Sequence, residues 1–384
     1  MRPIYLDNAA TTLPKPPCVA EAMAHYINRV GVNVGRGRYA AAYAAEELVL
    51  DTRERLAALF HAPDPRGVIF TSGATEALNV LLKGLLRPGD RVLVSPLEHN
   101  AVMRPLARLA AEGVFVDRLP CEADGATCAA AVEAMLTPET RAVVITHASN
   151  VCGTLQPVEQ IGAVCRRRGV YFIVDAAQTA GLCPLDMEAM GIDALAFAGH
   201  KALLGPQGIG GFAVSPSIAE QIEPLVAGGT GSRSHSEEMP SFLPDKFEAG
   251  TPNLPGIAGL NAALRWAEER GRDTLLAAEL DLTERFLAGL KPLAEQGRLT
   301  LLGRSDTAGR VGVVSVCPRR GEQAELAAAL EERFGILVRG GLHCAPAAHR
   351  ALGSYPAGSL RFSFGPGNTA ADADAALAAL RALL

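Results

Sequence analysis

Between about residues 68 and 214 the sequence alternates short apolar runs, rich in β-branched residues, with longer amphipathic runs. The short runs are strand candidates, and they cover residues 68–71, 91–94, 114–116, 142–146, 171–174, 194–198 and 211–214. The helical patterns between them include residues 75–86, 128–136 and 157–168. This alternation predicts an α/β fold with a mostly parallel, seven-stranded sheet and helices on both faces.

The pattern changes after Pro255, where long helices replace the alternation. Helices are predicted at about residues 256–270, 273–295, 322–334 and from 370, and strands at residues 299–302, 311–316, 336–338 and 360–363. Because 384 residues exceed the size at which one hydrophobic core usually keeps growing, we expect two domains. The predicted division is an N-terminal segment at residues 1–14 that packs with the small domain, a large domain at residues 15–255 and a smaller α+β domain at residues 256–384.

The charge pattern does not favour nucleic-acid binding. The formal net charge is -5, and the compact basic runs are residues 166–168, which end a helical pattern, and residues 319–320. The N-terminal residues lack the charged start and apolar run of a signal peptide, and no apolar stretch approaches the roughly 18 residues of a membrane span. We therefore expect a cytoplasmic protein that binds neither nucleic acid nor membrane.

The eight cysteines form neither a disulfide framework nor a zinc-site pattern. They lie at irregular spacings without a C-x-x-C pair, at positions 18, 121, 128, 152, 165, 183, 317 and 344. Cys344 with His343 and His349 lacks a fourth ligand and a suitable spacing for a metal ion. We expect no metal site, and a small buried hydrophobe is the first interpretation of each cysteine.

Polar residues follow the strand candidates at one end of the predicted sheet, where open α/β sheets bind their ligands. They are Ser72, Thr75 and Glu76, then Glu98, His99 and Asn100, then Ser149 and Asn150, then Asp175 and Gln178, and finally His200 and Lys201. Taken singly, each is more often a cap or a structural residue. Together they offer a helix N-terminus for a phosphate, a carboxylate for a ring nitrogen and a lysine for an aldehyde. Pyridoxal 5′-phosphate requires these groups, so the sequence predicts this cofactor.

The chain resembles the fold-type I pyridoxal-phosphate enzymes, and among them the class V aminotransferase group that contains cysteine desulfurases and selenocysteine lyases. The similar blocks occur in the same order over nearly the whole length, and they are YLDNAATT, SGATEALN, EHNAV, VDAAQ, GHK, EAGTPN, RGGLHCAP and LRFSFGPGNT. The resemblance implies a homodimeric enzyme.

The resemblance also implies a role for each matching residue. Lys201 would bind the cofactor aldehyde as an imine and carry protons, and Asp175 would pair with the pyridinium nitrogen. The other cofactor contacts would be Gln178 at the ring hydroxyl, His99 flat against the ring, Asn150 near the ring and the substrate amine, and Ala74, Thr75 and His200 at the phosphate. Thr251 would reach the phosphate from the partner subunit. Arg361 would clamp the substrate α-carboxylate with its planar fork of donors.

Cys344 decides which reaction the resemblance implies. It lies in a polar, proline-bounded segment, which we interpret as a flexible loop rather than a core strand, and His343 and Arg339 would favour its thiolate. In desulfurases a loop cysteine attacks the substrate sulfur, which leaves alanine and an enzyme persulfide. Arg339 would assist the substrate carboxylate or order the loop. The compact loop implies a separate sulfur-acceptor protein.

Three departures from the family pattern affect these expectations. Ala198 stands where relatives often carry a serine, which removes one hydroxyl from the phosphate site. Leu342 and Gly35 stand where relatives often carry histidines. The preference for cysteine or selenocysteine as substrate is therefore left open. We therefore expect a cysteine desulfurase that acts on L-cysteine, with a selenocysteine lyase, a cysteine sulfinate desulfinase and a catalytically idle, cofactor-bound scaffold as alternatives.

Overall fold

A seven-stranded sheet forms the centre of the computed structural model, which describes residues 3–35 and 37–384. The strand order is β2 (Val68–Thr71), β8 (Gly210–Val214), β7 (Ala194–Ala198), β6 (Tyr171–Asp175), β5 (Thr140–Thr146), β3 (Arg91–Val94) and β4 (Phe115–Arg118). Only β8 runs antiparallel to its two neighbours within this sheet. The predicted mostly parallel α/β fold is therefore confirmed.

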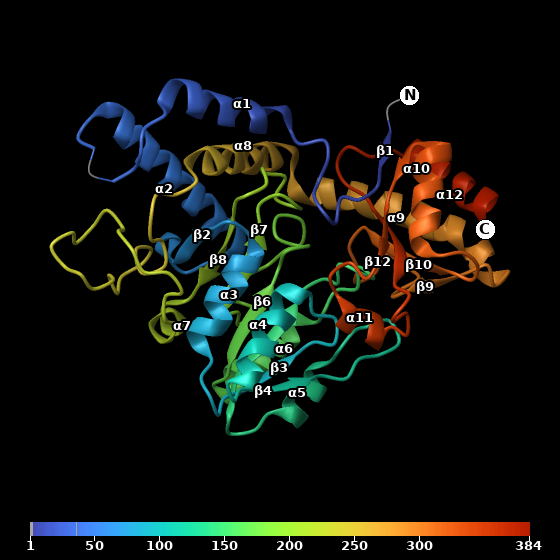
Figure 1. Ribbon diagram of the computed structural model, residues 1–384, viewed down its shortest axis with the longest axis horizontal. Helices are drawn as coiled ribbons and strands as arrows, with labels where there is room; N and C mark the ends of the chain where they lie inside the picture. Colours follow the sequence, from blue (N-terminus) through green and yellow to red (C-terminus); the bar gives the residue numbers. More distant parts are fainter. Residues whose placement is uncertain (1–2, 36) are drawn as a thin grey trace.

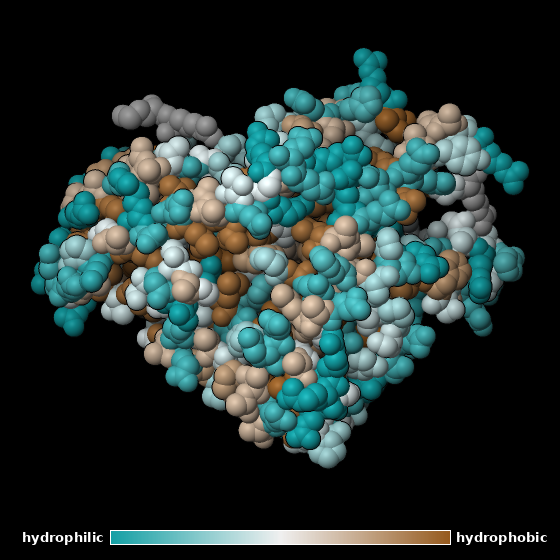
Figure 2. All heavy atoms as spheres, turned by 180° about the vertical axis from the view of Figure 1, so that it is seen from behind, coloured by the Kyte–Doolittle hydropathy of each residue, from teal (hydrophilic) through white to brown (hydrophobic). Residues whose placement is uncertain are grey.

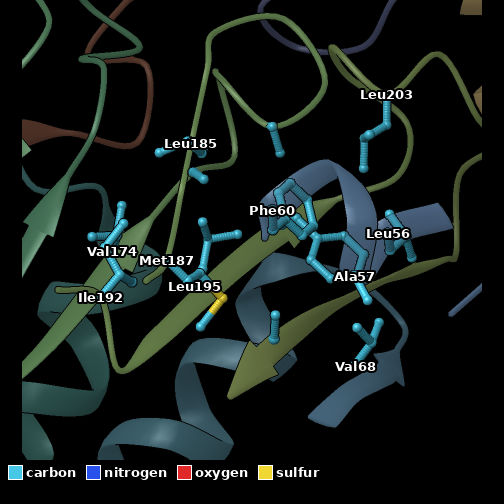
Figure 3. Close-up of a cluster of buried hydrophobic side chains, with 14 of the residues drawn as sticks. Leu56, Ala57, Phe60, Val68, Val174, Leu185, Met187, Ile192, Leu195 and Leu203 are labelled. Atoms are coloured by element: carbon cyan, nitrogen blue, oxygen red, sulfur yellow. The ribbon is translucent and has the colours of Figure 1, made fainter. Parts of the chain in front are cut away.

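Two layers of helices bury the two faces of this sheet (Figure 1). One face packs against α3 (Ala74–Leu85), α4 (Asn100–Ala111) and α7 (Pro216–Gln221), and the other against α2 (Ala40–Phe60), α5 (Ala129–Met135), α6 (Val158–Arg168) and α8 (Leu254–Arg270). Successive strand residues point to opposite faces, so Phe172 and Val174 of β6 enter one core while Ile173 enters the other. In Figure 3, Phe60 of α2 lies between Leu195 of β7 and Leu56 of the same helix.

A second, four-stranded sheet lies in the C-terminal part of the chain, with the order β12 (Arg339–Gly341), β13 (Ser359–Ser363), β10 (Val313–Pro318) and β9 (Leu299–Leu302). The helices of this part are α9 (Arg272–Glu295), α10 (Gln323–Phe334), α11 (Pro346–Ala351) and α12 (Ala370–Leu383). Near the N-terminus, β1 (Ile4–Tyr5) pairs in parallel with β11 (Ile336–Leu337). This pairing attaches the first residues of the described chain to the C-terminal part.

The division into domains stays a prediction. Residues 1 and 2 of the predicted N-terminal segment lie outside the described residues, as does residue 36. Helix α8 follows the predicted boundary at residue 255, yet its residues Ile257, Leu260 and Leu264 pack in the core of the large sheet. The helix α1 (Pro17–His25) lies along α8 at the edge of the molecule (Figure 1).

The sequence prediction differs from the structure at several strand ends, and β10 begins at Val313 rather than at residue 311. Strand β4 covers Phe115–Arg118 rather than residues 114–116, because Val114 is buried before the strand while Phe115 is exposed on it. Residues Arg339–Gly341 form β12, which pairs with β13 although the sequence predicts a loop there. This short edge strand contains two glycines and an arginine, so it shows no alternation of apolar and polar residues.

Polar side chains cover most of the face seen in Figure 2, and apolar side chains show between them toward the middle. Among the described residues, no helix combines the length and the apolar character that crossing a membrane would require.

Candidate active site

A cavity of about 220 Å³ opens at the carboxyl ends of β5, β6 and β7. It brings together eight of the residues that the sequence predicts for the cofactor, namely Ala74, Thr75, His99, Asn150, Asp175, Gln178, His200 and Lys201. They come from loops and helix starts that each follow a different strand. The parallel topology thus collects residues that lie far apart in the sequence.

Lys201 lies in this cavity three residues after the end of β7. Burial lowers the pKa of its amine to about 8, the carboxylate of Asp175 opposes this change, and the charge of Arg361 adds to it. A lysine with a pKa near 8 has a substantial neutral fraction near physiological pH. The neutral amine is the form that attacks an aldehyde.

Asp175 ends β6 and lines the same cavity. The backbone N–H of Ala177 donates to its Oδ1 at 2.9 Å. Burial raises the pKa of the Asp175 carboxyl, whereas this hydrogen bond and the charge of Lys201 lower it. The carboxylate and the lysine therefore stabilise each other's charged forms.

His99 is a neutral imidazole at the start of α4. Its Nδ1 accepts a hydrogen bond of 3.0 Å from the backbone N–H of Ala101, which assigns the ring proton to Nε2. Burial lowers the pKa of His99 to about 4, and the charge of Lys201 contributes. The ring is thus neutral and its orientation is set by the helix.

Glu98 is a buried acid after β3, and the sequence predicts no role for it. Its Oε1 accepts hydrogen bonds of 2.6 Å from Oγ of Ser95 and from the backbone N–H of Thr146. Burial raises the pKa of Glu98 to about 8, although the bond from Ser95 lowers it, and the charge of Asp175 raises it further. Glu98 therefore holds a proton at neutral pH close to Asp175. A glutamate after a strand looks like a loop residue, so the sequence carries no signal for this burial.

The end of the cavity where the sequence predicts a phosphate consists of small residues and one histidine. A Cβ atom on Gly210 would lie 2.6 Å from Cα of Gly73, so β8 and the start of α3 approach too closely for a larger residue. Nδ1 of His200 is buried and finds no hydrogen-bond partner within the described part of the chain. Ala198 also lines the cavity, where its methyl group provides no donor. Thr75 and the first N–H groups of α3 remain as donors at this end.

Arg361 of β13 is buried beside the cavity and binds the N-terminal segment of the chain. Its Nη2 donates to Oδ1 of Asp7 at 2.6 Å, and its Nη1 donates to the backbone oxygen of Asn150 at 3.1 Å. Arg339 donates to Oδ2 of the same aspartate from Nε at 3.0 Å and from Nη2 at 2.8 Å. Asp7 was not predicted as a site residue, although it lies in the YLDNAATT block.

Nε of Arg361 is buried and unpaired with respect to all residues the structure describes. A buried guanidinium N–H without an acceptor is costly, so this donor calls for a further acceptor. The predicted role of Arg361 in carboxylate binding fits this free donor and stays a prediction.

Cys344 is exposed in a turn between β12 and α11. His343 and Cys344 both have left-handed backbone conformations, with φ of 48° and 56°. Two hydrogen bonds hold this turn, one of 2.8 Å from Asn150 Nδ2 to the oxygen of His343 and one of 2.8 Å from the backbone N–H of Asn100 to the oxygen of Cys344. Asn150 also lines the first cavity, so its hydrogen bond attaches the Cys344 turn to the wall of that cavity.

The predicted influence of His343 on the thiolate is wrong. Its ring is buried, its Nε2 lies 3.0 Å from Oγ of Ser359, and burial lowers its pKa to about 2. A neutral imidazole does not stabilise a neighbouring thiolate by charge. The predicted influence of Arg339 on Cys344 stays a prediction.

Thr251 does not line the first cavity. It is exposed and lines a second cavity of about 390 Å³ together with Phe70, Leu225 and Val226. The predicted contact of Thr251 with the cofactor of a partner subunit stays a prediction.

Comparisons with known proteins show the family of this chain. The aminotransferase class-V model matches residues 4–376. A probable cysteine desulfurase of Methanothermobacter thermautotrophicus is 34% identical over 92% of this chain and 88% of its own length. The cysteine desulfurase CsdA of Escherichia coli is 33% identical over 97% of this chain and 92% of its own length.

Among solved structures, the apo cysteine desulfurase of Thermococcus onnurineus NA1 superimposes with a TM-score of 0.92 at 30% identity, covering 99% of this chain and 94% of that chain. The CsdA structure from Escherichia coli, in its S-sulfonic acid form, gives a TM-score of 0.87 at 30% identity, with the same coverage. The chain therefore belongs to the class-V aminotransferase family and, within it, to the cysteine desulfurases.

Proposed function

We propose that this chain removes sulfur from L-cysteine with pyridoxal 5′-phosphate as its cofactor, which yields L-alanine and a persulfide on Cys344. The observation that carries this proposal is an exposed thiol in a turn that Asn150, a residue of the cavity around Lys201, holds by a hydrogen bond of 2.8 Å to the oxygen of His343. The relatives named above are cysteine desulfurases, and they do not favour a selenocysteine lyase, a cysteine sulfinate desulfinase or an idle scaffold.

The residues of the first cavity fit pyridoxal phosphate. Lys201 supplies the amine for the aldehyde, Asp175 the carboxylate for the ring nitrogen, and His99 a neutral flat ring for the face of the cofactor. The unpaired Nδ1 of His200 offers a hydrogen bond to the phosphate, with Ala74 and Thr75 at the helix start. When bound, the cofactor withdraws electrons from the substrate carbon skeleton.

The remaining roles belong to the chain's own side chains. Arg361 binds the substrate carboxylate through Nε, while Asp7, which also accepts from Arg339, holds the guanidinium of Arg361 in place. Nζ of Lys201 takes and returns a proton at the substrate carbon. The thiolate of Cys344 attacks the substrate sulfur, so a bond between the two sulfurs forms as the bond from sulfur to carbon breaks. The electron pair of the broken bond stays on the carbon skeleton, which leaves as alanine after protonation.

The assembly and partners are part of the proposal. Large apolar side chains are exposed near the second cavity, between α1 and α2 and on α2, and these are Ile27, Tyr39, Tyr43, Leu50, Leu225 and Val226. Such exposure supports an interface with a second copy of the chain, to which Thr251 would contribute. We also propose a cytoplasmic location and transfer of the sulfur to a separate acceptor protein.

The test is to supply the purified chain with pyridoxal phosphate and L-cysteine and to measure alanine and sulfide in the presence of dithiothreitol. Wild-type protein is expected to form both products. Lys201→Ala is expected to form neither, and Cys344→Ala is expected to lose sulfide release by at least about 100-fold. Release by Cys344→Ala at the wild-type rate would overturn the sulfur-transfer role. Parallel assays with selenocysteine and cysteine sulfinate compare the alternative substrates.

A further inference from the structure

A groove of about 380 Å³ lies next to the Cys344 turn, between α4, β4 and α11. Apolar side chains form its floor, and these are Met103, Leu106, Ala107, Ala110, Val116, Pro346 and Ala347. It is separate from the first cavity, with which it shares no lining residue. In Figure 1, α11 lies beside α4 on the same side of the molecule as β4.

The charged residues of this groove are all arginines. Arg104, Arg118 and Arg350 are exposed at its rim, and of the described residues that line it none is acidic. Arg104 and Arg118 form no ion pair with any residue the structure describes, whereas Arg108 on the same helix pairs with Glu112 at 2.7 Å. The whole chain has a net charge of -5, so this concentration of positive charge is opposite to the overall balance.

The groove is connected directly to the reactive cysteine. Asn100 lines the groove and donates its backbone N–H to the oxygen of Cys344 at 2.8 Å. On the other side, Pro346 and Ala347 of the groove follow Cys344 by two and three residues. A chain segment bound in the groove would therefore end close to the exposed thiol.

We propose that this groove docks an apolar segment carrying acidic side chains from the sulfur-acceptor protein, and that it thereby brings the acceptor thiol to Cys344. This inference rests on the proposed function. Apolar side chains of the segment would cover the floor, and its carboxylates would pair with the three arginines. The mixture of an apolar floor and a single sign of charge selects against basic partners.

The transfer step that this docking serves balances without an added oxidant or reductant. The acceptor thiolate attacks the outer sulfur of the Cys344 persulfide, and a new bond forms between these two sulfurs. The bond between that outer sulfur and Sγ of Cys344 breaks, and its electron pair leaves Cys344 as a thiolate. The acceptor carries the persulfide away.

The experiment uses the full-length protein loaded with pyridoxal phosphate and two synthetic peptides. Both contain one cysteine and several leucines, and one carries glutamates where the other carries lysines. Sulfur transfer from persulfidated Cys344 to each peptide is followed by mass spectrometry. Binding is measured separately by fluorescence anisotropy with peptides in which serine replaces the cysteine. The test variant is Arg118→Glu combined with Arg350→Glu, and the matched control is Arg108→Glu on the outer side of α4.

We expect the acidic peptide to bind and accept sulfur at least about 10-fold better than the basic one at low salt, and to lose this advantage at high salt. The double variant should abolish the preference, while Arg108→Glu should keep it. The docking site would be overturned if the wild-type protein bound both peptides equally and transferred sulfur to them equally. It would also be overturned if the double variant still bound the acidic peptide better than the basic one. Alanine formation with dithiothreitol should be equal in all three proteins. If alanine is absent throughout, the proposed activity fails, and the anisotropy data still decide the docking site.

Discussion

Oδ1 of Asp7 accepts a hydrogen bond of 2.6 Å from Nη2 of Arg361, and these residues lie 354 positions apart in the sequence. Arg339 binds the other oxygen of the same carboxylate. One aspartate of the N-terminal segment thus pairs with two arginines beside the cavity and orients the one that is buried. Arg361 also donates to the backbone oxygen of Asn150, whose side chain binds the Cys344 turn. Hydrogen bonds therefore connect the N-terminal segment with the cavity and with this turn.

Substitution Asp7→Asn is expected to weaken substrate binding more than catalysis. The amide removes the negative charge that holds both guanidinium groups, and a hydrogen bond to a charged group contributes about 1.5–3 kcal/mol. We expect the KM for L-cysteine to rise about 10-fold or more, with a smaller change in kcat. Steady-state alanine formation measures both. Asp374→Asn serves as the control, because Asp374 pairs with Arg285 on the exposed surface, and equal kinetic constants for Asp7→Asn and Asp374→Asn would contradict the role of Asp7.

Capture of pyridoxal phosphate by the cofactor-free protein is expected to depend on pH through Lys201. The neutral amine reacts, and its pKa is lowered to about 8, so the capture rate should rise up to about pH 8 and level off above it. The carboxylate of Asp175 raises this pKa, so Asp175→Asn should move the midpoint to lower pH. Stopped-flow absorbance measures the rate. A midpoint near 10.5, the ordinary value for lysine, would show that Lys201 is not desolvated.

Glu98→Gln is expected to change how stability depends on pH. The folded protein raises the pKa of Glu98 from 4.5 to about 8, so between these values it holds a proton that the unfolded chain has lost. Stability therefore falls as pH rises through this interval, with a slope of up to about 1.4 kcal/mol per pH unit from this group. Glutamine keeps the shape and does not titrate.

Urea unfolding of wild type and Glu98→Gln at pH 5 and pH 8 measures the effect. The stability of the variant relative to wild type should increase by a few kcal/mol at the higher pH. Glu112→Gln is the matched control, because Glu112 is exposed directly after the end of α4. Parallel pH profiles for wild type and Glu98→Gln would mean that Glu98 is already ionised in the folded state.

Ala198→Ser is expected to tighten the binding of pyridoxal phosphate. Ala198 lines the phosphate end of the cavity, and a serine hydroxyl there would add a donor to a charged group. Such a hydrogen bond corresponds to a gain in affinity of about 10-fold or more. Titration of the cofactor-free protein, followed by absorbance, measures the Kd. An unchanged or weaker affinity would show that the hydroxyl does not reach the phosphate.

The central sheet and most of the cavity were predictable because local patterns define them. Continuous apolar runs such as residues 171–174 identify buried parallel strands, and the polar residues after each strand must meet at one edge. Asp175, His99 and Lys201 were therefore predicted to lie together at this edge, although the sequence gives no distances between them. The family blocks then connected these residues with Cys344 and Arg361.

Other features depend on contacts that no local pattern contains. The pairing of Asp7 with Arg361 joins the two ends of the chain, and the burial of Glu98 depends on Thr146 from another strand. His343 lies in a turn of two left-handed residues, and burial of its ring lowers its pKa to about 2. The sequence reveals neither the turn nor the burial. The three arginines of the groove come from α4, β4 and α11, so only the fold brings them together.

Mass spectrometry of the cofactor-loaded protein after brief incubation with L-cysteine is the most direct measurement of the central claim. After digestion, the peptide that contains Cys344 should be heavier by the mass of one sulfur atom, and treatment with dithiothreitol should remove this mass. Peptides with the buried Cys152, Cys165 and Cys183 should be unchanged. Alanine formation with no added sulfur on Cys344, or with added sulfur on another cysteine, would contradict the account.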